Sequence, residues 1–279
     1  NFDLRWIYST ISLLLINKKN TKIILWGAWL TGSTIANKIR LYFLKKSESS
    51  IFYTHNSRLD FVKLGVDINK TFVANNTFHV KKRSKLFLSK NKFRLLNVGS
   101  LNQRKRNDLL IIAFANIISK IPKHIILTFI GDGTEKTKLV NLVKDLNLNN
   151  RIQFINKIED SNDLHSYYSE SLCSLSFGQA GLSILQSFGY GIPYLTTLSA
   201  ISGGELYNVI SGYNGILSDD SIDSFENNIT AICNNIDLTR ELGKNAYKYY
   251  SQFCTIENMC QGFLDAIENT KLSCIDNRI

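Results

Sequence analysis

The 279-residue sequence lacks an apolar run long enough to cross a membrane as a helix. A membrane-spanning helix needs about 20 consecutive apolar residues, whereas the longest candidate, residues 6–16, is interrupted by Ser9, Thr10 and Ser12. We therefore expect this segment to form a buried or interfacial helix. The chain also shows no signal peptide and does not begin with methionine, which suggests a processed chain or a fragment.

Cysteine and histidine patterns that would organise a disulfide framework or a metal site are missing too. The five cysteines are odd in number, scattered, and form no Cys-x-x-Cys pair, and the four histidines show no metal-ligand spacing. These absences argue against a disulfide framework and a zinc site, and they favour a reducing compartment. No Asp-x-Asp occurs in the chain, and we predict no metal site.

Acidic residues are scarce in the first part of the chain. Residues 1–100 carry 18 Lys or Arg and 4 Asp or Glu, a net charge of +14, whereas residues 101–279 carry 15 and 19, a net charge of −4. The division indicates two parts with different partners, and a basic part attracts an anionic membrane surface, nucleic acid or phosphorylated substrates. No recognition helix, zinc-finger spacing or aromatic RNA-binding motif accompanies the charge, so nucleic acid is not expected as a partner. The alternative is a solvated, lysine-rich surface.

Short β-branched runs alternate with amphipathic stretches, and no internal repeat or low-complexity tract interrupts them. Strands are expected at residues 22–26, 50–54, 71–74, 93–98, 124–130, 151–155, 172–176, 193–196 and 215–217. Helices are expected at residues 3–17, 34–45, 57–64, 108–119, 135–146, 163–169, 182–190, 222–234, 238–253 and 256–268. This alternation predicts an α/β fold in which helices cover parallel sheets. The polar stretch at residues 81–92 separates two such series and marks the expected domain boundary.

Three strand-to-helix turns in the second series contain small or basic residues, at residues 99–106, 131–133 and 178–182. A glycine at the carboxyl end of a strand permits a sharp turn. A small-residue loop that leads into a helix exposes N–H groups that bind phosphate. Because the carboxyl ends of parallel strands meet at one edge of a sheet, the three turns predict a ligand crevice at that edge.

The same segment resembles the C-terminal half of glycosyltransferase family 4, a large group of retaining enzymes with the GT-B fold. Four blocks carry the resemblance in order: VGSLNQRKRNDLL at 98–110, FIGDG at 129–133, GQAGLSILQSFGYGIP at 178–193 and GGELYNVISGYNG at 203–215. Residues 21–80 also resemble the end of the family's N-terminal domain.

The resemblance implies an α/β protein with two Rossmann-like domains that face a cleft, the N-terminal one truncated. Residues 1–92 are then a partial, acceptor-side domain, and residues 93–252 are the nucleotide-sugar-binding domain. Residues 253–279 are expected to form a C-terminal helix that packs back toward the N-terminal domain.

The resemblance also implies a donor site. Lys105 falls on the family lysine that holds the donor's pyrophosphate and is the expected catalytic residue. The backbone N–H groups of Gly181 and Leu182 are expected to meet the same phosphates. The other donor-binding residues that we expect are Gly99, Ser100, Gly131, Gly133, Lys157, Gly178, Gln179, Ala180, Ser183, Gln186 and Glu205.

Several positions depart from the family pattern. Ser100 stands where an arginine is usual, and Ala28 stands near the position expected for the N-terminal catalytic histidine. Gly178 replaces a glutamate that contacts the donor sugar, and glycine offers no substitute for a carboxylate. Gln186 replaces a glutamate that holds the ribose hydroxyls, but its amide oxygen still accepts a hydrogen bond. Glu205 lies two residues before the position of the usual glutamate, and we expect it to contribute only a contact to the sugar.

The function that the resemblance implies is transfer of a sugar, with retention, from a nucleotide-diphosphate donor to a glycan or lipid-linked acceptor in surface polysaccharide synthesis. No cofactor is expected, because the nucleotide-sugar is a co-substrate. The basic N-terminal part suits a cytoplasmic protein that is peripheral on the anionic inner face of the membrane. The alternative is a catalytically silent GT-B protein that binds nucleotide or glycan or supports a partner transferase. A GT-B sugar epimerase would need acid or base residues in the cleft, of which the sequence offers few.

Overall fold

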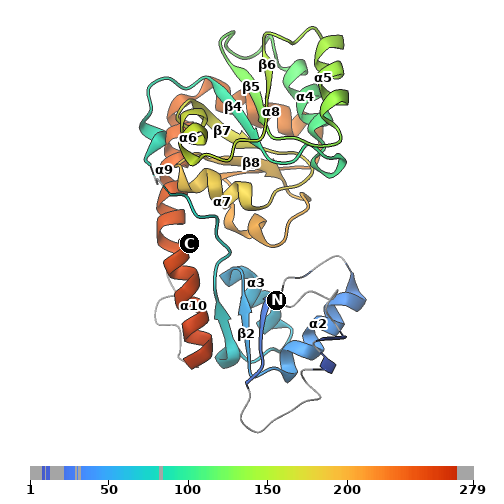
Figure 1. Cartoon of the computed structure of the whole chain (residues 1–279), viewed down its shortest axis with the longest axis vertical. Helices are drawn as coiled ribbons and strands as arrows, with labels where there is room; N and C mark the ends of the chain where they lie inside the picture. Colours follow the sequence, from blue (N-terminus) through green and yellow to red (C-terminus); the bar gives the residue numbers. More distant parts are fainter. Residues whose placement is uncertain are drawn as a thin grey trace. The chain divides into compact units, whose positions relative to one another are not determined.

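The computed structural model describes residues 8–9, 11–12, 22–28, 30, 33–81 and 84–268, which belong to two compact units (Figure 1). The first unit comprises Asn1–Thr77 and Phe253–Ile279, and the second comprises Phe78–Gln252. The helix expected at residues 3–17 lies mostly outside the described residues, although residues 8–9 and 11–12 are helical. Within the described part of the chain, each helix is too short or too polar to traverse a bilayer.

The first unit contains a three-stranded parallel sheet in the order β1-β2-β3. Its strands are β1 (Ile24–Ala28), β2 (Ser49–Phe52) and β3 (Thr71–Val73). The intervening helices are α2 (Thr34–Lys46), α3 (His55–Lys63) and the short η2 (Ile68–Lys70). Helix α10 (Ile256–Glu268) packs on β2 and β3. The first unit therefore combines an early and a late segment of the sequence.

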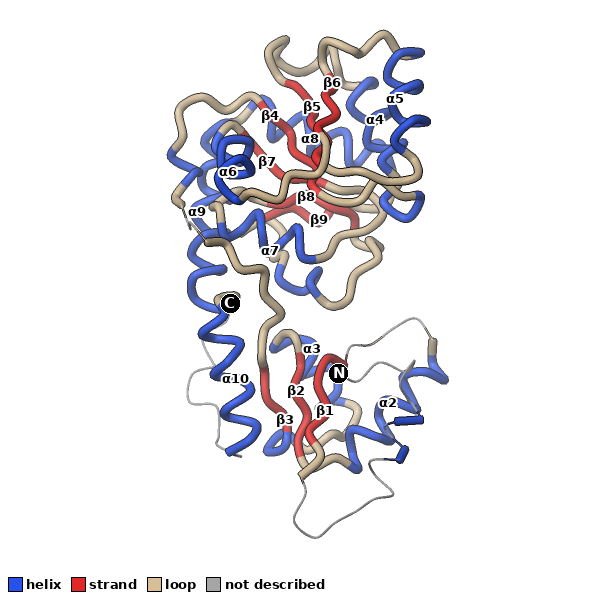
Figure 2. Tube along the Cα trace, viewed as in Figure 1, coloured by secondary structure: helices blue, strands red, loops and turns tan. Residues whose placement is uncertain are grey.

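The second unit contains a six-stranded parallel sheet in the order β6-β5-β4-β7-β8-β9 (Figure 2). Its strands are β4 (Arg94–Val98), β5 (Ile126–Ile130), β6 (Ile152–Ile155), β7 (Ser171–Leu175), β8 (Tyr194–Thr197) and β9 (Gly215–Ser218). The helices are η3 (Leu86–Leu88), η4 (Gln103–Lys105), α4 (Asn107–Asn116), α5 (Lys136–Asp145), α6 (Ser161–Ser169), α7 (Leu182–Gly189), η5 (Glu205–Asn208), α8 (Ile222–Asn234) and α9 (Ile236–Phe253).

The direction in which this sheet grows reverses at β4. From β4 the chain moves outward through β5 to β6, returns through α6 to β7 on the other side of β4, and moves outward again through β8 to β9. In an open α/β sheet, ligands bind at the carboxyl ends of the strands that flank such a reversal. The turns after β4 and β7 therefore define the part of the molecule where a ligand is expected.

Most of the secondary structure expected from the sequence is confirmed in the described part of the chain. All nine expected strands are present, close to their expected ends. The helix expected at residues 108–119 ends earlier, at Asn116. Beyond Asn116 the backbone hydrogen bonds join residues three apart, as in a 3-10 helix. They run from the Ile118 N–H to the Ala115 carbonyl oxygen and from the Lys120 N–H to the Ile117 carbonyl oxygen.

The two units separate between Thr77 and Phe78, rather than within or after the polar stretch at 81–92. Leu86 of this stretch and Val80, which directly precedes the stretch, are buried in the second unit. The Tyr250 hydroxyl donates to the Phe78 carbonyl oxygen at 2.7 Å, which ties the beginning of the segment to α9. Although the stretch carries many charges, a few buried apolar residues in and beside it attach it to the second unit.

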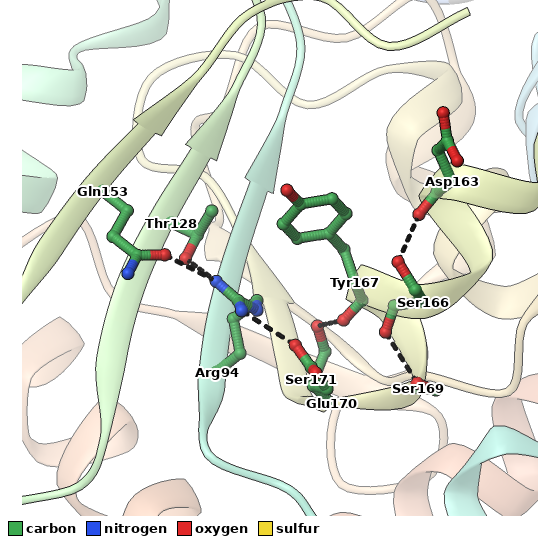
Figure 3. A network of polar contacts seen from close by, with 9 residues as sticks. All are labelled: Arg94, Thr128, Gln153, Asp163, Ser166, Tyr167, Ser169, Glu170 and Ser171. Carbon is green, nitrogen blue, oxygen red and sulfur yellow. Dashed lines mark hydrogen bonds and ion pairs between the residues drawn. The ribbon is translucent and has the colours of Figure 1, made fainter. Parts of the chain in front are cut away.

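A buried arginine joins the strands at the other end of this sheet (Figure 3). Arg94, the first residue of β4, is 6% exposed and donates to Thr128 on β5, to Gln153 on β6 at 3.2 Å, and to the Glu170 carboxylate at 2.8 Å. Its guanidinium carbon also lies 5.0 Å from the centre of the Tyr167 ring. Because Arg94 begins β4, this network lies away from the turns at the carboxyl edge and stabilises the sheet.

Candidate functional site

Lys105 joins the turn after β4 to the turn after β7. Its ammonium nitrogen donates to the backbone carbonyl oxygen of Gln179 at 3.2 Å, and its own carbonyl oxygen accepts from the Gly178 N–H at 3.1 Å. A Cβ atom placed on Gly99 would lie 3.6 Å from the Lys105 ammonium nitrogen, so this glycine lies directly beside the lysine. The structure therefore brings together Gly99, Lys105, Gly178 and Gln179, as expected for residues at the reversal of strand order.

The surroundings of Lys105 are only partly polar. Burial lowers the pKa of Lys105, the neighbouring Arg104 cation lowers this pKa further, and the Glu205 carboxylate opposes both. Glu205 is 7% exposed and accepts hydrogen bonds from the Ser202 hydroxyl at 3.1 Å and the Gly203 N–H at 2.9 Å. A cation held in this partly desolvated position attracts an anionic ligand more strongly than a cation in open water does.

Helix α7 begins next to the Gln179 carbonyl. Its N-cap residue, Gly181, supplies no side chain to cap the helix, and a Cβ atom on Gly181 would meet no heavy atom within 4 Å. Leu182, the first helical residue, is 41% exposed. The first N–H groups of a helix lack partners within the helix and carry the positive end of its dipole. The start of α7 thus faces open space and can accept an anion beside Lys105.

Gly131 and Gly133 allow the turn after β5 to touch the turn after β4. A Cβ atom on Gly131 would lie 1.9 Å from the Gly99 carbonyl oxygen, and one on Gly133 would lie 2.3 Å from that of Leu101. The Leu101 N–H also donates to the Asp132 carbonyl oxygen at 2.9 Å. These two glycines shape the wall of the site by permitting close backbone contact.

Ser100 and Gly178, the two departures from the family pattern in these turns, each have identifiable neighbours. Ser100 is exposed, and its hydroxyl accepts from the Asn102 side-chain amide at 2.8 Å. A Cβ atom on Gly178 would lie 2.5 Å from the Arg104 carbonyl oxygen and 2.6 Å from the Arg106 Cγ atom. A glutamate at position 178 is therefore incompatible with this conformation of the turn at 102–106.

Helix α7 turns its polar side chains toward the protein. Ser183 shares a 2.8 Å hydrogen bond with the Tyr194 hydroxyl, which donates to the Ser176 hydroxyl at 3.1 Å. Burial raises the pKa of Tyr194, so this hydroxyl keeps its proton. Gln186 is 6% exposed and Ala180 is fully buried. Ser183 is thus bound to the sheet, and Ala180 presents no side chain to a ligand.

Lys157 is not brought to this group. It follows β6, and β5 and β4 both lie between β6 and β7 in the sheet. Its side chain is 71% exposed and forms a 2.8 Å ion pair with Glu159. Of the expected site residues, Lys157 is the one that the strand order separates from Lys105.

Tyr194, which sequence reasoning did not include, and Arg106 contribute to the geometry. Tyr194 holds Ser183, and nothing in the sequence signals this contact, since the tyrosine occupies an ordinary strand position. Arg106 adopts a left-handed conformation with φ 49° and ψ 43°, a conformation that glycine adopts most readily. Within the described residues, no three His, Cys, Asp or Glu side chains gather in an arrangement able to hold a metal ion.

The sequence pattern of the family described as Glycosyl transferases group 1 matches residues 79–249, which is more than half of the chain. The chain belongs to this glycosyltransferase family. Among curated relatives, an uncharacterized glycosyltransferase of Methanocaldococcus jannaschii is 28% identical over 174 residues, which cover 53% of this chain and 42% of the relative. The N-acetyl-alpha-D-glucosaminyl L-malate synthase of Bacillus anthracis is 26% identical over 103 residues, covering 37% and 26%. The chain spans less than half the length of these curated relatives.

Solved structures of glycosyltransferases share the fold of this family member. Anabaena HepE in complex with UDP matches with a TM-score of 0.73 and 18% identity, over 96% of this chain and 77% of HepE. Staphylococcus aureus TarM, in complex with Fondaparinux, alpha-GlcNAc-glycerol and UDP, matches with a TM-score of 0.69 and 18% identity, over 93% and 53%. The expected GT-B fold is thereby confirmed.

Proposed function

We propose that this chain is a retaining glycosyltransferase that moves a sugar from a nucleotide-diphosphate donor to a glycan or lipid-linked acceptor in surface polysaccharide synthesis. One observation carries the proposal. In a member of the glycosyl transferases group 1 family, the Lys105 ammonium group lies 3.2 Å from the Gln179 carbonyl oxygen, two residues before the N-cap of α7. The TarM and HepE structures, which share this fold and contain UDP, support a nucleoside diphosphate as the leaving group.

The chemistry that these groups serve is stabilisation of the departing phosphate. The bond from the anomeric carbon to the β-phosphate oxygen breaks, and its electron pair leaves with the nucleoside diphosphate. A bond forms from the anomeric carbon to the acceptor oxygen, and the proton of the acceptor hydroxyl passes to an oxygen of the departing phosphate. Lys105 and the N–H groups at the start of α7 stabilise the negative charge that grows on the phosphate. The proposal includes no cofactor, because the nucleotide-sugar is the co-substrate.

The test is release of nucleoside diphosphate from a panel of nucleotide-sugars, with and without glycan acceptors. Lys105→Ala should lower turnover by about 10²–10³, the effect of losing one preorganised charge-stabilising group. Lys144→Ala removes the same charge from an exposed position on α5 and should leave turnover unchanged. Equal turnover of Lys105→Ala and the unaltered protein would remove Lys105 from the mechanism.

A catalytically silent protein that binds nucleotide or glycan is the second candidate, and Gly178 favours it. The Arg104 carbonyl oxygen and the Arg106 side chain leave no room at this position for the family's sugar-binding carboxylate. On this reading, nucleotide-sugars bind but are not consumed. Thermal stabilisation without turnover distinguishes the two, since a ligand at 100 times its dissociation constant adds about 2.7 kcal/mol to the free energy of unfolding.

The proposal also includes a cytoplasmic location on the anionic inner face of the membrane, supported by the exposed side of α2. Ile35 and Tyr42 are 74% and 59% exposed. Lys38 and Lys45 are exposed at positions three and four residues from them, so all four share one row of the helix. Exposed apolar residues beside lysines are typical of helices that lie on anionic lipid. Arg40, by contrast, is buried and does not belong to this row.

Vesicle sedimentation tests the membrane proposal. The protein should sediment with vesicles that contain anionic phosphatidylserine and remain in solution with neutral phosphatidylcholine vesicles. Lys38→Glu should weaken the binding, since each lysine near such a surface contributes about 1 kcal/mol. Binding that is indifferent to lipid charge would end the membrane proposal without affecting the proposed reaction.

A further inference from the structure

A small polar pocket lies in the second unit beside the turn that carries Lys105. Its volume is about 230 Å³, and its walls come from η4, the first turn of α4 and the start of α5. Among its described lining residues, none belongs to the set that the sequence assigns to the donor. The Leu101 N–H donates to the Asp132 carbonyl oxygen at 2.9 Å, and the Glu135 N–H donates to the Leu101 carbonyl oxygen at 3.0 Å. These bonds hold the walls in place.

Two asparagines that line the pocket have amide atoms with no partner among the described residues. Asn107 is 3% exposed, and neither its amide oxygen nor its amide nitrogen forms a hydrogen bond. The amide oxygen of Asn102 is also buried without a partner, although its nitrogen donates to Ser100. Buried amides without partners are rare and costly in folded proteins. Three such atoms at one pocket indicate that a bound molecule supplies the missing hydrogen bonds.

The charged side chains of the pocket neutralise one another. The Arg106 Nε atom lies 3.4 Å from Asp108, and the Lys138 ammonium lies 3.4 Å from Glu135. Two cations and two anions paired in this way leave no net charge to attract a phosphate or a metal ion. Carboxylate and amide oxygens accept hydrogen bonds from hydroxyl groups, and the amide nitrogen donates to them. The lining therefore suits a neutral molecule with several hydroxyl groups.

The volume restricts the molecule further. Pockets that hold drug-sized ligands measure about 300–1,000 Å³, so the volume of this pocket suits a molecule the size of a single sugar ring better than a whole nucleotide. We propose that the pocket binds one neutral sugar ring through the side chains of Asn102 and Asn107. The lining residues of this pocket are different from the residues proposed to bind the donor, and the pocket needs no sugar transfer to operate.

The experiment measures binding of glucose, galactose and N-acetylglucosamine to the whole chain by NMR titration, with open-chain sorbitol as the comparison. At least one ring sugar should bind saturably, with a dissociation constant on the order of 1–10 mM, and sorbitol should bind more weakly. Saturating UDP should leave the sugar affinity unchanged.

Asn107→Ala should have two opposite effects. Without sugar, it should raise the Tm by about 2–8 °C, because it removes a buried amide that lacks partners. It should also weaken sugar binding at least about tenfold, as expected for the loss of two ligand hydrogen bonds. The matched control is Asn116→Ala on the same helix, where the exposed side chain donates to Glu226, and it should produce neither effect.

Three results would overturn the proposal. They are the absence of a saturable response up to about 50 mM of every ring sugar, an Asn107→Ala variant that keeps full affinity or has a lowered Tm, and displacement of the sugar by UDP. The last result would assign the sugar to the donor site. None of these measurements depends on turnover, so failure here is distinct from failure of the proposed transferase activity.

Discussion

Lys92 is a buried cation on the second unit, and its replacement offers a quantitative test of the structure. The side chain is 8% exposed, and its ammonium group donates to the Ser171 carbonyl oxygen at 2.6 Å. Burial lowers the pKa of Lys92 to about 7, the Arg240 cation contributes in the same direction, and Cys173 opposes them. In the unfolded chain the pKa returns to its ordinary value near 10.5.

The sign of the effect follows from proton binding. Between pH 7 and about 10.5 the unfolded chain keeps a proton on Lys92 that the folded protein has released, so the free energy of unfolding rises with pH in this window. The full difference of about 3.5 pKa units corresponds to about 5 kcal/mol. Below pH 7 both states are protonated, and the stability no longer depends on this group.

Lys92→Met keeps most of the aliphatic chain and removes the titration. The expected result is a variant whose free energy of unfolding lacks the rise that the unaltered protein shows from pH 7 to 9.5. At pH 6.5 the variant should be the more stable of the two, because relief of the buried charge exceeds the loss of about 1 kcal/mol for one hydrogen bond.

Urea unfolding at pH 6.5, 8 and 9.5 measures both quantities. Lys90→Met is the matched control, since it removes a nearby lysine that is exposed. Parallel pH curves for the unaltered protein and Lys92→Met would refute the reasoning, because they would mean that Lys92 keeps its charge in the folded state.

Three further predictions concern the site. Because burial lowers the pKa of Lys105, the KM for the donor should rise on the alkaline side before an ordinary lysine deprotonates; steady-state kinetics from pH 7 to 10 check this, and a flat KM would contradict it. Gly178→Ala should destabilise the protein by about 1–3 kcal/mol, since its Cβ would lie 2.5 Å from the Arg104 carbonyl oxygen; an unchanged urea midpoint would show that the turn adapts. Tyr194→Phe should raise the donor KM about fivefold, with a smaller change in kcat. The reason is that loss of the 2.8 Å hydrogen bond to Ser183 removes about 1 kcal/mol of the free energy that holds the start of α7 in place. Equal kinetics would show that the helix is held by other contacts.

Much of the site's location was predictable from local sequence. Glycine directly after a short, largely apolar run marks the end of a strand, and this places Gly99 and Gly131 at the carboxyl edge of a parallel sheet. Lys105 follows the first of these turns within a few residues, so its position near that edge also follows from local pattern. The resemblance to a known family added the expectation that Lys105 meets the helix that begins at Leu182.

Other features were beyond prediction because they join residues far apart in the chain. The space beside Gly178 is limited by the Arg104 carbonyl oxygen and the Arg106 side chain. The Asn107 amide has no hydrogen-bond partner among the described residues, and this follows only from where the fold places its neighbours. Lys157 shows the same limit in reverse: it lies at the correct edge, yet the strand order separates it from Lys105.

The sequence by itself determined the alternation of strands and helices, the turns between them and the family, because each depends on backbone preferences and spacing within a short stretch. Only the tertiary structure decided that the Lys105 ammonium lies against Gln179 and that the segment from Phe78 belongs to the second unit. Those outcomes depend on the order in which the strands assemble, and in this sheet the order reverses at β4, which brings the two turns together across 74 residues of chain.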